Sequence, residues 1–256
     1  MPLLQSAPDW CFLKPPLDPA AYYRGLRAIG FTAAEIVPPE RLALAHAAGL
    51  RVLSLFGHDQ SRGLNRPEDH PATFAALRSA FALAAQNHIP HVICFSGARH
   101  GAPDSAGIQH CITALRTLAP EAAAANVTLT LEVFNKFDHP GYQADSSAYA
   151  FEVVRAVNSP NVKVLFDIYH MHRMGEPVTE VILENLPHIA HLHIAGSPLR
   201  NFPAPPPTQQ IDYATLVRRV HAAGYRGYWG HEYHPVKDSL TELAVSYALF
   251  ASYVST

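Results

Sequence analysis

Short runs of apolar residues alternate along the chain with longer stretches in which apolar positions recur every three or four residues. The short runs are nearly continuous in Val, Ile, Leu and Phe, as expected of strands that are buried on both faces. Eight such runs predict strands, at residues 10–13, 34–37, 51–56, 91–95, 128–133, 162–168, 191–195 and 227–232. The helical spacing between them predicts helices that include residues 71–86, 108–125, 147–157, 213–223 and 240–253.

Regular alternation of strands and helices indicates βα units and a parallel sheet. The chain has 256 residues, close to the ~250 of one (β/α)₈ barrel. We therefore predict an α/β protein with a single (β/α)₈ TIM barrel domain that spans residues 1–256. A doubly wound open sheet stays the alternative, because a strand count does not prove that the sheet closes.

Two of the predicted loops are long, at residues 57–70 and 197–211, and the second contains four prolines between Pro203 and Pro207. Long loops in compact domains are often functional. Both follow predicted strands, so both belong to the C-terminal face of the barrel, where barrel enzymes keep their active sites.

Composition excludes several classes of protein. No apolar stretch approaches the ~20 residues of a membrane span, and the N-terminal residues lack the pattern of a secretory signal, so we expect a cytoplasmic protein with no membrane partner. The formal net charge is −2 and there is no Lys/Arg-rich block, which argues against a nucleic-acid partner. Three scattered cysteines, Cys11, Cys94 and Cys111, are too few for a disulfide framework and are expected to be reduced thiols.

The later predicted strands share an unusual feature, since each ends in a residue that can bind a metal ion. Glu132, Asp167, His193 and Glu232 fall at or near the ends of four consecutive strands. In a parallel barrel these ends lie on one face. Charges at the ends of apolar strands have to be neutralised, and repulsion among three carboxylates would raise their pKa values unless a cation were present.

Three carboxylates and one imidazole are hard or borderline donors, which suit Mn²⁺, Mg²⁺, Co²⁺ or Zn²⁺. The pattern therefore predicts one divalent metal ion, with positions left open for a hydroxyl and an adjacent carbonyl of a substrate. Taken one at a time, each carboxylate is more often a surface group or an ion-pair partner, and His193 is more often a core histidine. A salt-bridge network at the barrel mouth is the structural alternative.

Two further residues are candidates for substrate binding. His170 lies three residues after Asp167, within reach of the same strand end. Arg200 follows the seventh predicted strand and can bind a carboxylate or hydroxyls of a small substrate. A helix-capping or surface histidine and a solvated loop arginine are the alternatives.

At these residues the chain resembles the hydroxypyruvate isomerase-like branch of the xylose isomerase-like TIM barrels, a superfamily of sugar isomerases and epimerases. The resemblance covers nearly the whole chain. It is carried by Trp10-Cys11-Phe12, Gly63-Leu64-Asn65-Arg66, Asp138-His139-Pro140-Gly141-Tyr142-Gln143, Phe166-Asp167-Ile168-Tyr169-His170-Met171, His191-Leu192-His193-Ile194-Ala195-Gly196 and Gly230-His231-Glu232-Tyr233.

The resemblance implies that Glu132, Asp167, His193 and Glu232 hold the metal ion, Mn²⁺ or Mg²⁺ first and Co²⁺ or Zn²⁺ as alternatives. It implies that Glu132 and Glu232 are the catalytic proton-transfer pair, acting through an enediolate. It also implies that His170 and Arg200 contact a small sugar or sugar-acid substrate. Barrels of this kind often form dimers or tetramers, so a homo-oligomer is compatible with it.

The function implied is interconversion of a small hydroxy-carbonyl acid, of the hydroxypyruvate/tartronate semialdehyde type. The chain departs from that branch in two places. Many hydroxypyruvate isomerases carry Gln at the position of His193, whereas the ketose 3-epimerases carry His there, as this chain does. In addition, Gln209-Gln210 replaces a frequent Gly-Glu pair. A ketose 3-epimerase is therefore the alternative on the same metal site. An endonuclease IV-like hydrolase and a non-catalytic sugar-binding barrel are alternatives from other classes.

Overall fold

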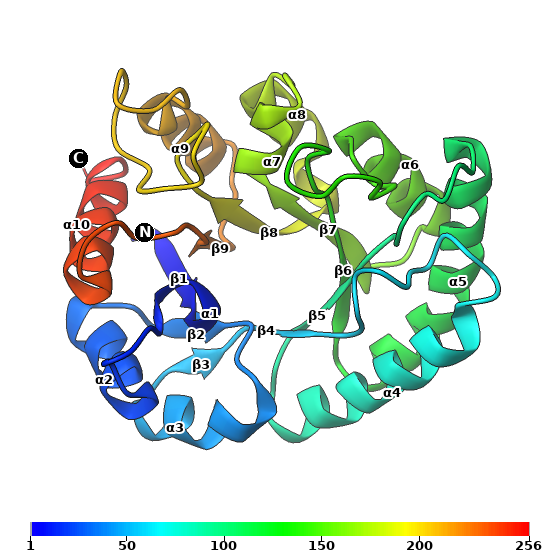
Figure 1. Cartoon of the computed structure of the whole chain (residues 1–256), viewed down its shortest axis with the longest axis horizontal. Coiled ribbons are helices and arrows are strands. Elements are labelled where there is room, and N and C mark those ends of the chain that lie inside the picture. Colours follow the sequence, from blue (N-terminus) through cyan, green and yellow to red (C-terminus); the bar gives the residue numbers. More distant parts are fainter. Residues whose placement is uncertain (1, 256) are drawn as a thin grey trace. The chain divides into compact units, whose positions relative to one another are not determined.

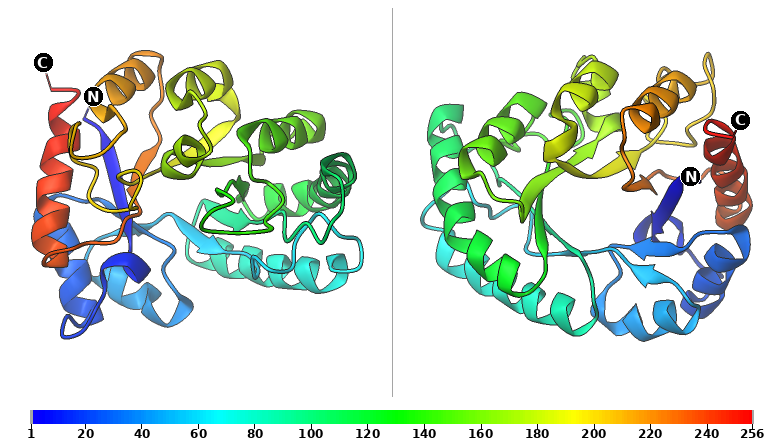
Figure 2. Two further views of the ribbon diagram at one scale, coloured as in Figure 1. Left: turned by 45° about the horizontal axis from the view of Figure 1, so that its top comes forward. Right: turned by 180° about the vertical axis from the view of Figure 1, so that it is seen from behind.

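The computed structural model describes residues 2–255, which divide into two compact units. Unit 1 comprises Met1–Leu53, Pro177–Leu186 and His191–Thr256, and unit 2 comprises Ser54–Glu176 and Pro187–Ala190. In each unit, helices flank parallel strands (Figures 1 and 2). Met1 and Thr256, the ends of the predicted domain, lie outside the described residues. That residues 1–256 form a single domain stays a prediction.

Unit 1 contains five parallel strands in the order β3-β2-β1-β9-β8. They are β1 (Leu4–Pro8), β2 (Ala33–Glu35), β3 (Arg51–Val52), β8 (Ile189–Ile194, of which the first two residues belong to unit 2) and β9 (Tyr228–His231). The helices are α1 (Asp9–Phe12), α2 (Pro19–Ile29), η1 (Pro39–Arg41), α3 (Leu42–Ala47), α8 (Val178–Asn185), α9 (Tyr213–Ala222) and α10 (Ser239–Ser252). The short 3-10 helix η2 (Leu186–His188), of which the last two residues belong to unit 2, precedes β8.

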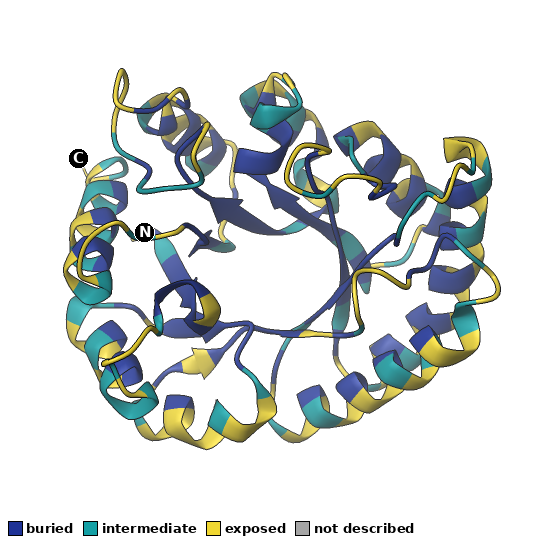
Figure 3. Cartoon of the chain, viewed as in Figure 1, coloured by how far each residue is buried: buried dark blue, intermediate teal, exposed yellow. Residues whose placement is uncertain are grey.

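Unit 2 contains four parallel strands in the order β4-β5-β6-β7. They are β4 (Ser54–Phe56), β5 (His91–Cys94), β6 (Thr128–Glu132) and β7 (Val162–Asp167). The helices are α4 (His70–Gln86), α5 (Asp104–Ala124), α6 (Ser147–Val157) and α7 (Ile168–Arg173). The strands of both units are largely buried (Figure 3), which explains why most of them are continuous apolar runs.

Helix boundaries follow local chemistry. Asp18, Asp212 and Asp238 cap α2, α9 and α10, because each carboxylate accepts a hydrogen bond from the backbone N–H three residues later. Asn158 ends α6 in the left-handed conformation. The five helices predicted from apolar spacing are confirmed as α4, α5, α6, α9 and α10.

Two strand predictions are wrong in detail. Residues 10–13 fall mainly in helix α1, and the first strand is Leu4–Pro8. That strand was missed because it contains Gln5 and Ser6, which are buried polar residues whose side chains donate to the Tyr247 carbonyl and to Glu35. Residues 51–56 form two short strands, β3 and β4, rather than one. The other six predicted strands are confirmed within a few residues.

The cysteines behave as predicted. Within the described residues, Cys11, Cys94 and Cys111 are all buried and form no disulfide. Burial raises the pKa of each of these thiols, which keeps them protonated and unreactive. Among the described residues, no helix has the length and apolar character needed to cross a membrane.

The long loop after β4 packs tightly against the loop after β5. The backbone N–H groups of Leu64 and Asn65 donate to the carbonyls of Phe95 and Ser96, at 3.2 and 2.8 Å. A side-chain carbon at Gly63 would lie 1.9 Å from the Ser96 carbonyl oxygen. Gly63 is therefore required by this close approach of two backbone segments.

Gly63→Ala should lower the free energy of unfolding by about 3 kcal/mol, because backbone atoms cannot move aside as a flexible side chain can. Urea denaturation followed by circular dichroism measures the change. Gly101→Ala is the matched control: its backbone φ is +79° but its surroundings are open, so it reports only the conformational penalty of roughly 1–2 kcal/mol. Equal losses in the two variants would contradict the steric explanation.

Candidate functional site

Unit 2 brings Glu132 and Asp167 together at the C-terminal ends of neighbouring strands. Glu132 is the last residue of β6 and Asp167 the last of β7, and both are buried. A carboxylate oxygen of one lies within 4.8 Å of a carboxylate oxygen of the other. Asp167 also caps helix α7, since its Oδ1 accepts the backbone N–H of His170 at 2.9 Å. Two of the four predicted metal ligands are therefore neighbours within this unit.

His170 is completely buried, and two hydrogen bonds show that its Nδ1 is an acceptor. Its Nδ1 accepts the backbone N–H of Asn135 at 3.2 Å and the side-chain N–H of Asn135 at 2.6 Å. The Asn135 amide is oriented by the backbone N–H groups of Phe137 and Asp138, which donate to its Oδ1. A neutral imidazole with an accepting Nδ1 carries its proton on Nε2, and this atom lies 3.6 Å from Asp167 Oδ2.

Aromatic rings surround His170. Phe134, His139 and Tyr169 all lie within ring-contact distance of it, and Phe134 stacks on His139 at 4.1 Å between ring centres. His170 thus combines a fixed ring orientation with an N–H directed toward Asp167. Sequence reasoning did not identify Asn135 or rank His139, although His139 belongs to one of the motifs that carry the resemblance.

Unit 1 brings together the other two predicted ligands. His193 lies in β8 and Glu232 directly follows β9, and these strands are paired with His193 opposite Gly230. Nδ1 of His193 lies 3.2 Å from Oε2 of Glu232. Both side chains are buried, so the pair is shielded from water at the C-terminal edge of the strands.

Arg200 and Trp10 meet the same carboxylate. Arg200 Nη2 donates to Glu232 Oε2 at 2.5 Å, and Trp10 Nε1 donates to Oε1 at 3.3 Å. The Arg200 guanidinium also lies over the Trp10 ring, 5.4 Å from its centre. Burial by itself raises the pKa of Glu232, but its neighbours, Arg200 among them, lower it well below its ordinary value, so the group is a carboxylate at neutral pH.

Each unit therefore provides two of the four predicted ligands as buried neighbours at strand ends. Carboxylate oxygens and an imidazole nitrogen are donors that suit a divalent cation of the Mg²⁺, Mn²⁺ or Zn²⁺ type. That the two pairs share one ion stays a prediction, as do the catalytic and substrate-binding roles. The sequence did not identify Trp10 as a residue of the site, because its contact with Glu232 joins residues at opposite ends of the chain.

Other histidines that the sequence left unranked have structural partners. His58 Nε2 accepts the backbone N–H of Phe95, at 3.0 Å, and His70 contacts the Leu64 carbonyl, at 2.9 Å. His231 is buried in unit 1 between Gln5 and Ser246, at 2.8 and 2.9 Å. These three rings hold loops and strands in place.

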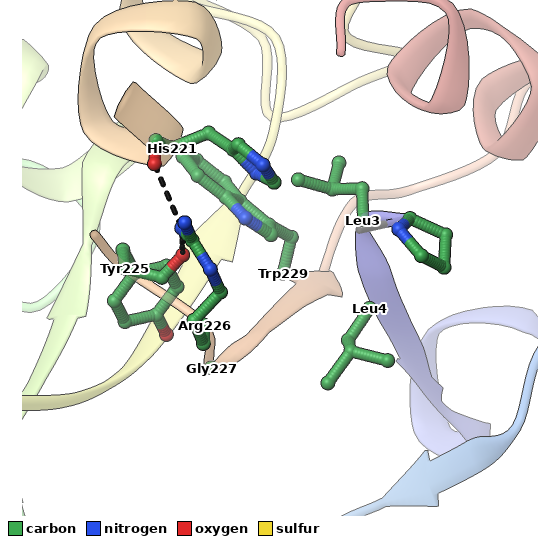
Figure 4. Close-up of a pocket in the computed structure, with 8 residues that line it drawn as sticks. Leu3, Leu4, His221, Tyr225, Arg226, Gly227 and Trp229 are labelled. Carbon is green, nitrogen blue, oxygen red and sulfur yellow. Dashed lines mark hydrogen bonds between the residues drawn. The ribbon is translucent and has the colours of Figure 1, made fainter. Parts of the chain in front are cut away.

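A cavity of about 280 Å³ lies at the other end of the unit 1 strands. It is lined mainly by Leu3, Leu4, Tyr225 and Trp229, near the N-terminal ends of β1 and β9 (Figure 4). Arg226, at its edge, donates to the His221 carbonyl at 2.7 Å. The N-terminal face of parallel strands usually contributes stability rather than chemistry, so this cavity does not belong to the candidate site.

Comparison with known sequences identifies a family. The family model described as "Xylose isomerase-like TIM barrel" matches residues 22–249. A putative hydroxypyruvate isomerase of Mus musculus is 28% identical over 254 residues, which cover 92% of this chain and 91% of that protein. The hydroxypyruvate isomerase of Escherichia coli K12 is 33% identical over 121 residues. That match spans about half of each protein, 47% of this chain and 46% of the relative.

A solved structure described as an AP endonuclease, family 2, from Brucella melitensis has the same fold. It superimposes with a TM-score of 0.84 at 23% identity and covers 99% of both chains. At this identity the likeness shows the fold alone. It nevertheless favours the barrel over the doubly wound open sheet.

The buried His231 predicts an acid-sensitive stability. Burial lowers its pKa from 6.5 to about 3, so the folded protein keeps this ring neutral where the unfolded chain binds a proton. Above pH 6.5 the titration of His231 therefore leaves the free energy of unfolding unchanged. As the pH falls from 6.5 toward 3, it lowers that free energy progressively. Between pH 6.5 and 5 it should lower the free energy of unfolding by about 2 kcal/mol, at about 1.4 kcal/mol per pH unit.

His231→Gln should reduce this loss, because Gln can hydrogen-bond within the same site but does not titrate. The measurement is urea unfolding of both proteins at several pH values between 5 and 7.5. The two curves of stability against pH should diverge below pH 6.5. Parallel curves would mean that His231 is not the group responsible.

Proposed function

The chain belongs to the xylose isomerase-like TIM barrel family, and from this premise we propose that it is a divalent-metal-dependent isomerase of a small hydroxy-carbonyl acid. Its fold is the α/β barrel of that family, and we take residues 1–256 as one (β/α)₈ domain. The named candidate reaction is the interconversion of hydroxypyruvate and tartronate semialdehyde. The names of the Escherichia coli and mouse relatives support this choice.

The observation that carries the proposal is the placement of buried ionisable groups at the C-terminal strand ends in both units. Glu132 and Asp167 are neighbours in unit 2, and His193 and Glu232 are neighbours in unit 1. In a TIM barrel all strands end at one face. We therefore assign the four side chains to a single metal centre at the mouth of the family's barrel.

The donor set fits a divalent ion. Buried carboxylates gathered without a cation would repel each other, and a short His193–Glu232 separation of 3.2 Å suits two ligands of one ion. We assign Mn²⁺ or Mg²⁺ first, with Co²⁺ or Zn²⁺ as alternatives. When bound, such an ion would act as a Lewis acid toward a carbonyl and its neighbouring hydroxyl and favour the enediolate form of the substrate.

Glu132 and Glu232 are assigned the proton transfers. One carboxylate removes the proton from the carbon next to the carbonyl, and a carboxylate returns a proton to the neighbouring carbon, which gives the isomer. Both groups are shielded from water. Arg200 and Trp10 both donate to the carboxylate of Glu232 and keep it ionised, so it can accept a proton at neutral pH. Acid–base catalysis of this kind contributes ~10²–10⁴-fold in rate.

Arg200 and His170 are assigned to substrate binding. Arg200 has a planar fork of N–H donors that suits carboxylates, as its bond to Glu232 illustrates, and we assign it to a substrate carboxylate. His170 carries its proton on Nε2, so it can donate to a substrate oxygen while Asn135 holds the ring. Trp10 forms an aromatic wall beside Arg200. A short, anionic substrate suits this combination.

A ketose 3-epimerase is the second candidate, and the identity of residue 193 favours it. His193 stands where the chain departs from many hydroxypyruvate isomerases and agrees with the ketose epimerases. The same two glutamates would then act on opposite faces of one carbon. The two candidates differ in the substrate's charge and length rather than in the acid–base chemistry.

The decisive experiment follows deuterium uptake from D₂O by NMR. Hydroxypyruvate and a panel of ketoses are incubated with the purified protein and Mg²⁺ or Mn²⁺, and again with EDTA. We expect metal-dependent deuterium incorporation at the carbon next to the carbonyl of hydroxypyruvate, with tartronate semialdehyde as product. Exchange with ketoses alone would establish the epimerase, and exchange that persists in EDTA would contradict metal dependence.

Glu132→Gln and Glu232→Gln should each lower kcat by about 10²–10⁴-fold, because Gln cannot accept the substrate proton. Steady-state kinetics with hydroxypyruvate measure the loss. Glu152→Gln and Glu184→Gln are matched controls, since both residues are exposed on helices of units 2 and 1 respectively. The controls should keep wild-type kcat. Near-normal turnover in either site variant would refute the two-glutamate scheme.

Arg200→Met should separate the two candidate substrates. Loss of a charge-assisted hydrogen bond should raise KM for hydroxypyruvate by about ten- to a hundredfold, whereas KM for a neutral ketose should change far less. Any effect on Glu232 changes kcat for both substrates and cancels in the comparison. A similar rise in KM for both would contradict the assignment of Arg200 to a substrate carboxylate.

A further inference from the structure

A second buried carboxylate in unit 1, that of Glu35, contacts His193 on the side of the ring away from Glu232. Glu35 is the last residue of β2 and is fully buried. Its Oε2 lies 2.6 Å from Nε2 of His191 and 3.1 Å from Nε2 of His193. Its Oε1 accepts the hydroxyl of Ser6 at 3.0 Å. Side chains from β1, β2 and β8 therefore meet at one carboxyl group.

The contacts of Glu35 give the direction of these hydrogen bonds. Its Oε2 lies within hydrogen-bond distance of two ring nitrogens, and its Oε1 accepts from Ser6. A carboxylate can accept several hydrogen bonds, whereas a protonated oxygen could donate to only one of the two rings. In the arrangement in which Glu35 accepts all three bonds, each Nε2 carries the proton.

The direction of this hydrogen bond decides which nitrogen of the His193 ring has the lone pair. A neutral imidazole has one N–H, so a ring that donates from Nε2 presents a lone pair at Nδ1. Nδ1 is the atom that lies 3.2 Å from Glu232 Oε2. In the neutral ring the lone pair therefore lies on the side of Glu232, where a metal ion held by both groups would neutralise the carboxylate, and Glu35 lies on the opposite side.

We propose that Glu35 is the positioning residue of the metal centre: it holds His193 in the Nε2–H form, so that Nδ1 is the ligand atom. This inference rests on the proposed function for the metal, but the hydrogen bond between Glu35 and His193 is a property of the chain itself. Carboxylates that accept the second N–H of a ligating histidine fix its tautomer and orientation and strengthen metal binding.

Gly230 leaves the space that the contact between Glu35 and His193 requires. Gly230 of β9 lies opposite His193 in β8. A side-chain carbon at position 230 would lie 2.3 Å from Glu35 Oε1 and 2.7 Å from Cδ2 of His193. Any larger residue would therefore displace either the carboxylate or the ring. The absence of a side chain at Gly230 leaves the space in which Glu35 reaches His193.

A second interpretation of the same residues is a metal site of their own. Glu35, His191 and His193 offer ligand atoms within 4.8 Å of one another. The contact of 2.6 Å between Glu35 and His191 has the length of a charge-assisted hydrogen bond, which favours positioning over ligation. The two interpretations differ in stoichiometry, one ion per chain against two.

The first test measures Mn²⁺ binding by the full-length, metal-stripped protein, with calorimetry for affinity and stoichiometry. We expect one Mn²⁺ per chain, and about 10- to 100-fold weaker binding by Glu35→Gln. Glu40→Gln is the matched control, because Glu40 is five residues away and exposed, and it should bind as the wild type does. A folded Glu35→Gln with wild-type affinity, or two ions per wild-type chain, would overturn the proposal.

The second test reads the tautomer directly, by ¹⁵N–¹H NMR of ¹⁵N-histidine-labelled protein, with and without Mg²⁺. Wild-type His193 should show a protonated Nε2 in both samples, with a proton shifted downfield by the hydrogen bond, and Glu35→Gln should lose that shift. His193→Gln assigns the signal. An unprotonated Nε2 in the wild type overturns the proposal, even if Glu35→Gln fails to fold.

The two tests separate this proposal from the proposed function. If the wild type binds no divalent ion, the metal-dependent isomerase fails, and with it the ligand role of His193. The NMR measurement then still decides whether Glu35 sets the tautomer. If the wild type binds Mn²⁺ but Glu35→Gln binds it equally well, the proposed function survives and the positioning role does not.

Discussion

A carboxylate buried inside a protein has to be matched by hydrogen-bond donors or by positive charge, and this requirement organises the C-terminal edge of unit 1. His193 lies between two such carboxylates, with Nδ1 3.2 Å from Glu232 and Nε2 3.1 Å from Glu35. Arg200 and Trp10 complete the surroundings of Glu232. Glu35 and His193 can approach each other because β8 pairs with β9 at Gly230, which has no side chain to occupy the space between them.

Unit 2 meets the same requirement with different means. Asp167 accepts the backbone N–H of His170 in the first turn of α7, and the Asn135 amide holds the His170 ring with its N–H on the Asp167 side. Tyr142 donates to the Glu132 carbonyl and accepts from Ser96, which ties the ends of β6 and β5 together. In both units, acceptor groups at strand ends are held by donors from neighbouring loops. A cation would complete such an arrangement, which is why the metal proposal and the packing agree.

Most of the architecture could be predicted from periodicity, because strands buried on both faces have to be apolar throughout. That rule succeeded for β5, β6 and β7. It failed for β1, where buried Gln5 and Ser6 interrupt the apolar run and are satisfied by partners far away in the sequence. It also merged β3 and β4, because only Leu53 lies between them and an apolar residue does not reveal that β3 pairs with β2 whereas β4 pairs with β5.

The sequence by itself determined the repeated βα order and the residues at the strand ends, because strand length and side-chain type are local properties. It identified Glu132, Asp167, His193 and Glu232 as candidates by their place after apolar runs. Only the tertiary structure decided what each of them contacts. Trp10 meets Glu232 across 222 positions and Glu35 meets His191 across 156. Contacts between residues so far apart have no local signature, and they set the charge, tautomer and orientation on which the chemistry of the site depends.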